Sequence, residues 1–278
     1  MKEAERQRDR ETQKEWWVLS LLLCFSVSLL LGSKGSFAQD WKELKGDHFI
    51  IYYASEDKFP SEVLRKAESY YQQISSDLGY QRYSNFWQWE NRVKIYVYPT
   101  RNEFLAETNQ PDWSYGVANY TDKEIRSYLW SEGFMDALLP HEMTHLIFRD
   151  YVGFKGEVPL WLDEGVAQWE EPAKRAIVKK YMKSVMGKSK VFSLQELTKM
   201  DVRRGADEEV ANLFYLEAAS LIDFLVERYG AEGFIAFCRQ LRDGKNLDEA
   251  LKFAYPTSVR NLNEMEEKWK KFISEAVP

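Results

Sequence analysis

Two histidines, spaced four residues apart, carry the most informative chemistry in this 278-residue sequence. His141 and His145 enclose Glu142 in the pentapeptide HEMTH. On an α-helix, residues four apart lie on one face, so the two imidazoles would reach the same point. Two imidazole nitrogens suit a tetrahedral zinc ion. Glu142, about 100° further around the helix, could contact a metal-bound water without itself filling a coordination position.

The pattern is rare enough to be informative. The chain has 3 histidines, and a chance match is expected on the order of once in several hundred such chains. The alternative is a pair of histidines on a solvated helix face. The third histidine, His48, opens the strand-like segment 48–53, which we expect at a sheet edge, and we interpret it as structural.

A catalytic zinc ion commonly takes a third protein ligand and leaves one position for water. Downstream of His145 the sequence has no further histidine and one cysteine, Cys238, so the third ligand must be a carboxylate or that thiol. The segment 160–169, LWLDEGVAQW, offers Asp163 and Glu164. Eighteen residues separate His145 from Glu164, which is enough for a helix to end, a loop to turn the chain and a second helix to return antiparallel.

His-Glu-x-x-His together with Trp-Leu-x-Glu-Gly-x-Ala within 160–169, whose glutamate follows the second histidine after eighteen residues, resembles the zinc signature of the gluzincin metallopeptidases, in particular their peptidase MA-like families. The resemblance implies a zincin-like fold and hydrolysis of peptide bonds with one Zn²⁺ per chain. It implies His141, His145 and Glu164 as metal ligands, with Asp163 as the competing choice. It also implies Glu142 as the general base.

The family comparison bears on the substrate as well. The aminopeptidase branch carries a Gly-x-Met-Glu-Asn strand whose glutamate binds a free amine, whereas the comparable segment here, 116–120, reads GVANY. The absence of this glutamate weakens an aminopeptidase assignment and leaves endopeptidase action open. In this fold, the strand before the zinc helix usually forms an edge along which a peptide can pair. Either 115–120 or 124–130 could be that edge.

Further side chains could assist the metal site or the substrate. Relatives carry a tyrosine near the start of a later helix, so Tyr215 is the candidate donor to the oxyanion, the alternative being one more core aromatic. Gln168, one turn beyond Glu164, could support the site, but we expect a solvated surface glutamine. Arg203 and Arg204 could meet a substrate carboxylate, although a solvated loop pair is favoured.

Hydrophobic periodicity predicts the elements that position these residues. Strands are predicted at 48–53, 92–98, 115–120 and 124–130. Helices are predicted at 60–78, 211–229, 231–241 and 263–277, with Gly230 and Gly244 as stops. Strand signals cease after residue 131. The sequence therefore predicts an α+β fold in which a small mixed sheet (39–130) precedes the metal-binding helix and a mainly helical half (131–278).

The N-terminal segment predicts export. Residues 16–31 form an uncharged apolar run that would span roughly 24 Å as a helix, which suits the core of a signal peptide better than a bilayer crossing. Ser36 and Ala38 are the small residues that a signal peptidase requires, so we predict cleavage after Ala38 and a periplasmic or secreted protein. The charges before residue 16 cancel, so an uncleaved membrane anchor at residues 16–32 is the alternative.

Composition excludes several other classes of protein. A hydrophobic content of 45% argues against disorder, and a formal net charge of -6 argues against broad electrostatic capture of nucleic acid. After signal cleavage Cys238 stands alone, so the mature chain has no intramolecular disulfide. We expect a zinc metallopeptidase acting on a peptide or protein, with membrane contact only through an uncleaved anchor. The alternatives are an inactive peptide-binding module and a structural envelope protein with a vestigial motif.

Overall fold

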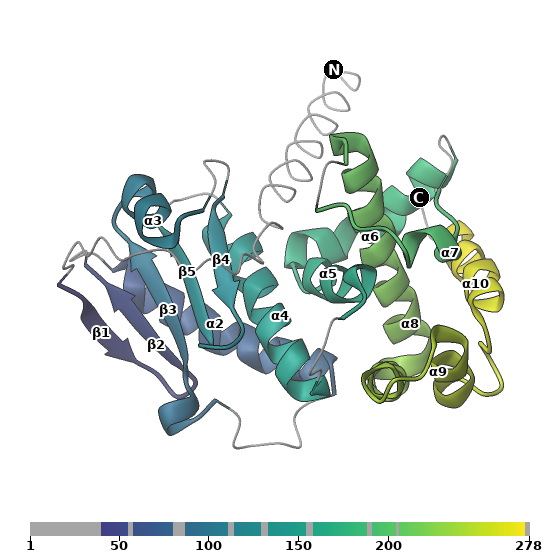
Figure 1. The fold of residues 1–278 in the computed structure, drawn as a ribbon, viewed down its shortest axis with the longest axis horizontal. Coiled ribbons are helices and arrows are strands. Elements are labelled where there is room, and N and C mark those ends of the chain that lie inside the picture. Colours follow the sequence, from purple (N-terminus) through teal and green to yellow (C-terminus); the bar gives the residue numbers. More distant parts are fainter. Residues whose placement is uncertain are drawn as a thin grey trace.

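The computed structural model describes residues 40–54, 58–79, 87–110, 114–128, 133–153, 158–187, 191–203 and 206–275. The predicted signal peptide and its alternative, the membrane anchor, lie outside these residues. Within them, no helix combines the length and apolarity that a membrane crossing requires. The chain folds as a sheet-containing N-terminal part followed by a mainly helical part, which confirms the predicted α+β class (Figure 1).

A five-stranded mixed sheet forms the first part. Its strands are β1 (Lys42–Lys45), β2 (Phe49–Tyr53), β3 (Val93–Tyr98), β4 (Gly116–Asn119) and β5 (Glu124–Tyr128). Their spatial order is β1-β2-β3-β5-β4, with β2, β3 and β5 parallel and the two outer strands antiparallel to their neighbours. Of the two candidate edge strands, β4 is the one at the edge.

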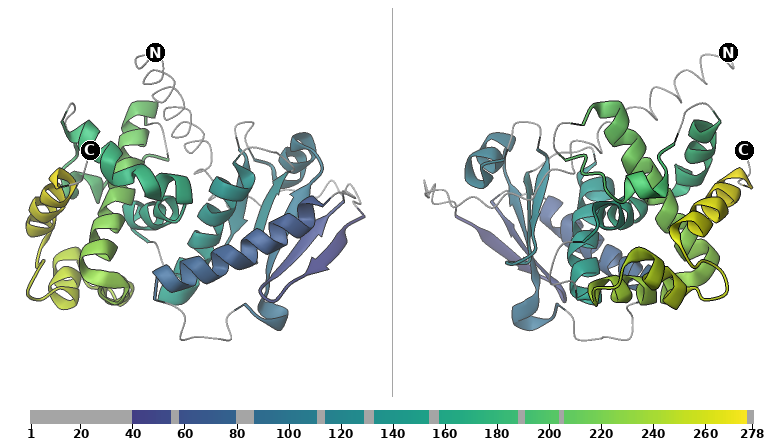
Figure 2. Two further views of the ribbon diagram at one scale, coloured as in Figure 1. Left: turned by 180° about the vertical axis from the view of Figure 1, so that it is seen from behind. Right: turned by 45° about the vertical axis from the view of Figure 1, so that its right-hand side comes forward.

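One face of the sheet is covered by the helix α2 (Phe59–Asp77), which crosses it in Figure 2. Alternation in β3 buries Val93, Ile95 and Val97 on one face, and the helical spacing of Val63 and Ala67 brings α2 against the same core. On the opposite face, the short helix α3 (Arg101–Thr108) packs against β5. One turn of 3-10 helix (Trp89–Asn91) precedes β3.

His48 is structural, as predicted, but its strand is not at an edge. It directly precedes β2, which lies between β1 and β3. The sequence of β1, KELK, is charged and has no apolar alternation, so this outer strand was not predicted. The Nδ1 atom of His48 lies 2.6 Å from Oε2 of Glu68, and the imidazole stacks on the ring of Tyr71. These contacts fasten the start of β2 to α2.

The second part consists of helices. A short π-helix (Phe134–Leu138) leads into α4 (Leu139–Val152), which is followed by α5 (Leu160–Trp169), α6 (Pro172–Met186), α7 (Leu194–Leu197), α8 (Glu208–Arg242), α9 (Leu247–Ala254) and α10 (Leu262–Ser274). Helix α8 consists of two helical stretches that meet at Gly230, as predicted: this residue has a non-helical backbone, with φ 82° and ψ 158°, and kinks the helix there. Gly244 follows the end of α8 with a φ of 86°, as a stop requires.

Helix α4 connects the two parts. It contacts β4 at the sheet edge and α5 on its other side, so it lies between the sheet and the C-terminal helices (Figure 1). Helix α5 in turn packs closely against α8. A Cβ atom added to Gly165 would lie 2.8 Å from the carbonyl oxygen of Ala218, so only glycine permits this approach. The packing of β4, α4, α5 and α8 therefore determines where the predicted site residues meet.

Candidate metal centre

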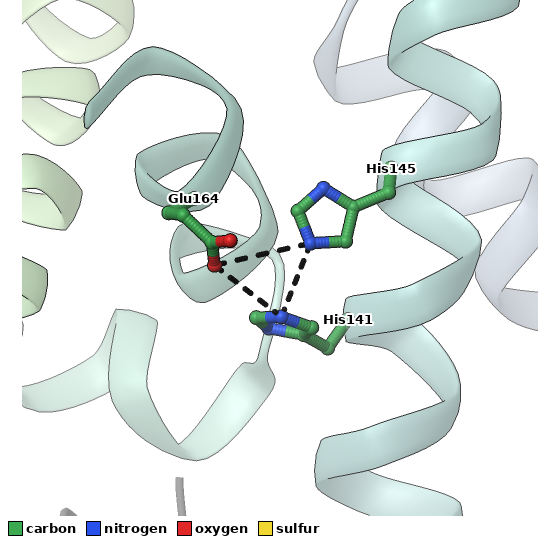
Figure 3. Close-up of side chains that lie close together, drawn as sticks. All are labelled: His141, His145 and Glu164. Atoms are coloured by element: carbon green, nitrogen blue, oxygen red, sulfur yellow. Dashed lines mark hydrogen bonds and ion pairs between the residues drawn. The ribbon is translucent and has the colours of Figure 1, made fainter. Parts of the chain in front are cut away.

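Helix α4 presents both histidines to one point. His141 and His145 lie one turn apart on a helix with a largely buried surface, so their imidazoles point the same way (Figure 3). Pro140 occupies the first turn, where its missing N–H removes no intrahelical bond. Gly153 ends the helix with a φ of 81°, and α5 then brings Glu164 back toward α4.

Three potential ligand atoms converge in this space. The Nε2 atoms of His141 and His145 are 3.2 Å apart, and Oε2 of Glu164 lies 3.8 Å from the first and 3.9 Å from the second. All three side chains are buried, with exposed fractions of 1%, 5% and 6%. Among the described residues, this is the group of histidine, cysteine, aspartate and glutamate side chains that is close enough to hold a metal ion. The structure thus brings the three predicted ligands together.

Helix α6 begins beside His141 and supplies an outer partner for it. The Nδ1 atom of His141 lies 2.9 Å from Oε1 of Glu171, and the same oxygen accepts a hydrogen bond of 2.7 Å from Nζ of Lys174. Lys174 also donates to Oε1 of Gln168. Gln168 is fully buried, so the expectation of a solvated surface glutamine is wrong: its amide oxygen accepts a hydrogen bond from a buried ammonium group instead.

His145 has an outer carboxylate of its own. Its Nδ1 atom lies 3.2 Å from Oδ1 of Asp163, whose Oδ2 accepts a hydrogen bond of 2.7 Å from Arg149. Asp163 therefore contacts the side of the imidazole that faces away from Glu164. This arrangement favours Glu164 over Asp163 as the third ligand.

The donor set fits a divalent cation. A carboxylate next to each Nδ1 atom favours the tautomer in which Nδ1 carries the proton, leaving both Nε2 atoms with lone pairs. Those lone pairs face each other and Oε2 of Glu164, an oxygen for which the described part of the chain supplies no hydrogen-bond donor. Around this point, the four carboxyl groups outnumber the cationic side chains of Lys174 and Arg149 by two. The carboxyl groups are those of Glu142, Asp163, Glu164 and Glu171.

Burial and charge shift the pKa values of the surrounding groups. Burial lowers the pKa of His145, but Asp163, Glu164 and Glu142 more than offset this and raise it to about 9. Burial would raise the pKa of Asp163, yet His145 and Arg149 hold it well below its usual value. Burial is also the main cause of the raised pKa of Glu142. The buried carboxyl groups therefore favour positive charge at this point.

The other sequence candidates are Glu142 on α4, Tyr215 and Cys238 on α8, and Arg203 in the segment before α8. Glu142 is buried on α4 beside the two histidines, as predicted. Tyr215 is buried on α8, the helix that packs against α5. Arg203 is paired with Asp201 at 2.7 Å, and this hydrogen bond, with a smaller contribution from the charge of Glu164, raises the pKa of its guanidinium group. Cys238 is fully buried in α8, burial raises its thiol pKa, and it is not in the converging group.

Sequence reasoning missed the outer partners Glu171, Lys174 and Arg149. Helical spacing gives a weak signal that two of these side chains, Arg149 and Lys174, lie near the site. Arg149 follows His145 by four residues, and Lys174 follows Glu171 by three, so each pair shares a helix face. The contact of Glu171 with His141 spans 30 residues and needs the return of the chain through α5, which no local pattern indicates.

Comparison with known proteins is consistent with this geometry. None of the curated proteins matches the sequence. The family model of the Peptidase MA superfamily matches residues 85–275, which is more than half of the chain and includes α4, α5 and the converging side chains. The chain therefore belongs to the Peptidase MA superfamily.

Proposed function

We propose that this protein is a zinc-dependent peptidase of the gluzincin type, with His141, His145 and Glu164 as the metal ligands. One observation carries the proposal: both Nε2 atoms and Oε2 of Glu164 face one buried point, while a carboxylate occupies the Nδ1 side of each histidine. Outer carboxylates of this kind orient histidines in zinc sites. Membership of the superfamily supports peptides or proteins as the substrate class.

The metal, Glu142 and Tyr215 would each have a separate role in hydrolysis. A zinc ion would act as a Lewis acid that polarises the scissile carbonyl and lowers the pKa of water. Glu142 takes a proton from the attacking water and passes it to the leaving amine. The raised pKa that burial gives Glu142 suits a group that must both accept and donate. Tyr215 would donate a hydrogen bond to the oxyanion that forms on the substrate.

The edge strand β4 provides the surface for the peptide. It contacts α4 and pairs with β5 on one side, and among the described residues no strand pairs with its other side, along which an extended chain could add. Main-chain pairing along β4 would bring a peptide past the metal centre without selecting its side chains. This mode of binding suits an endopeptidase as well as an exopeptidase.

The place of action is a separate part of the proposal. The apolar run at residues 16–31 and the small residues Ser36 and Ala38 support export with cleavage after Ala38. An uncleaved anchor at residues 16–32 is the alternative. N-terminal sequencing of the exported protein distinguishes them: a first residue of Gln39 supports cleavage, and an intact N-terminus supports the anchor.

Metal analysis and peptide digestion test the function together. Purified protein should contain one zinc ion per chain, and it should cleave a peptide library until a chelator removes the metal. Glu142→Gln should retain zinc and lose hydrolysis. Glu267→Gln, at an exposed position on α10, should retain both. Zinc binding without cleavage of any peptide would favour an inactive peptide-binding module. The absence of stoichiometric zinc would favour a structural envelope protein with a vestigial motif.

A further inference from the structure

Arg149 contacts two of the elements that surround the metal centre and lies on a third. It lies on α4 one turn beyond His145, so both side chains point toward α5. Its NH2 group donates a hydrogen bond of 2.7 Å to Asp163 on α5. Its guanidinium carbon lies 4.4 Å from the centre of the ring of Tyr120, the residue that follows β4. One side chain therefore joins the metal-binding helix, the helix of Glu164 and the end of the edge strand.

The contact with Asp163 links Arg149 to His145, a proposed metal ligand. Arg149 occupies one oxygen of this buried carboxylate, and the other oxygen lies 3.2 Å from Nδ1 of His145. A buried carboxylate without a cationic partner is costly, and its side chain would move toward another donor or toward water. Arg149 thus keeps Asp163 in the position from which it orients the imidazole of His145.

The contact with Tyr120 links Arg149 to the end of the edge strand β4. A guanidinium group over an aromatic face contributes about 0.5–2 kcal/mol, depending on exposure. The ring of Tyr120 also meets the imidazole of His145 edge to face, with 6.2 Å between the ring centres. The end of β4 is therefore packed against both the arginine and the ligand that the arginine orients.

We propose that Arg149 is a positioning residue that acts in two directions: through Asp163 it orients His145 for metal binding, and through Tyr120 it sets the position of β4 relative to the metal. The first direction rests on the metal binding in the proposed function but not on hydrolysis. A lysine would keep the charge at this position but lose the planar stack on Tyr120.

A double-mutant cycle tests the first direction. Zinc affinity is measured by competition with a chelator in Arg149→Gln, Asp163→Asn and the double variant. Arg149→Gln should bind zinc about 10–100-fold more weakly than the wild type. If Arg149 acts through Asp163, the double variant should bind as Asp163→Asn alone does. Arg239→Gln is the matched control, because Arg239 also stacks on a tyrosine, Tyr151, and should leave zinc affinity unchanged.

Amide hydrogen exchange of the metal-free protein tests the second direction. Arg149→Gln and Tyr120→Leu should each speed exchange across 116–120 by roughly threefold or more, and Arg239→Gln should not. Arg149→Lys should bind zinc with an affinity between those of the wild type and Arg149→Gln. If the glutamine variant does not fold, the lysine variant replaces it in the affinity measurement.

The possible failures are distinguishable. Wild-type zinc affinity in Arg149→Gln, or additive losses in the double variant, would overturn the role toward His145. Unchanged exchange across β4 would overturn the role toward Tyr120. A wild-type protein that binds no zinc would overturn the proposed function and, with it, the part of this inference that concerns His145.

Discussion

The Nδ1 atom of His141 lies 2.9 Å from Oε1 of Glu171, a residue thirty positions further along the chain. A carboxylate can only accept a hydrogen bond, so this contact makes Nδ1 the donor and leaves the lone pair on Nε2, the atom that faces His145 and Glu164. Lys174 binds the same oxygen and compensates the buried charge. The tautomer of His141 is thus set by the start of α6, beyond the two helices that carry the candidate ligands.

Replacing Glu171 by alanine should weaken zinc binding about 10–100-fold, because the imidazole of His141 loses the group that fixes its tautomer and orientation. Lys174 would also be left buried without its carboxylate. Competition with a chelator measures the change. Glu267→Ala, on the exposed side of α10, is the control. An affinity equal to that of the wild type would show that Glu171 has no role at the metal.

Replacing Gly165 by alanine should destabilise the protein, because the new Cβ would lie 2.8 Å from the backbone oxygen of Ala218 and force α5 away from α8. Overpacking of this kind costs about 1–3 kcal/mol. Thermal unfolding should show a lower Tm, and zinc affinity should fall because Glu164 is the adjacent residue. Gly187→Ala is the matched control, since its nearest neighbours would be at 3.7 Å. Equal Tm values for the two variants would contradict the prediction.

Replacing Tyr215 by phenylalanine should lower kcat about 10²–10³-fold, the usual loss when one oxyanion donor is removed. Zinc content should not change, because the tyrosine is not among the converging ligands. Tyr229→Phe, on the same helix α8, should leave kcat unchanged. If turnover is the same in both variants, Tyr215 is a core aromatic and takes no part in the reaction.

Much of the fold follows from local patterns. Alternation in β3 and helical spacing in α2 are strong signals because each element buries one continuous apolar face. The edge strand β1 and the helix α3 were missed for the same reason: β1 has no fully buried residue, and α3 has one, Phe104. Such elements form because neighbouring strands and caps fix them, which a periodicity argument does not detect.

The candidate site divides in the same way. The three candidate ligands, which the structure brings together, could be predicted because two of them share a helix face and the third belongs to a recognisable segment. The burial of Gln168 could not be predicted, because a glutamine in a helix is ordinarily solvated and its contact with Lys174 depends on how the chain returns into α6. Outer partners depend on how α4, α5 and α6 pack, and a single sequence carries little information about such long-range polar contacts.

Glu170 makes the stability of the protein depend on pH. Its side chain is fully buried, and burial raises its pKa to about 8; Asp77 adds to the shift and Arg175 opposes it. The guanidinium group of Arg175 lies 3.8 Å from Oε2 of Glu170 but also pairs with Asp77, so one cation is shared by two carboxyl groups. Because the pKa is higher in the folded than in the unfolded state, stability is lost as the pH rises from about 4.5 to about 8.

Glu170→Gln removes this ionisable group while keeping the size of the side chain and the pair between Asp77 and Arg175. The variant and the wild type should have similar free energies of unfolding near pH 5, where Glu170 is protonated in the folded protein. The variant should become the more stable of the two by on the order of a few kcal/mol at pH 9. Denaturant unfolding across this range measures the difference, in which the contributions of all other titrating groups cancel. Glu209→Gln, at an exposed position, should show no such trend. A constant difference between Glu170→Gln and the wild type would mean that Glu170 titrates as an ordinary carboxyl group in the folded protein.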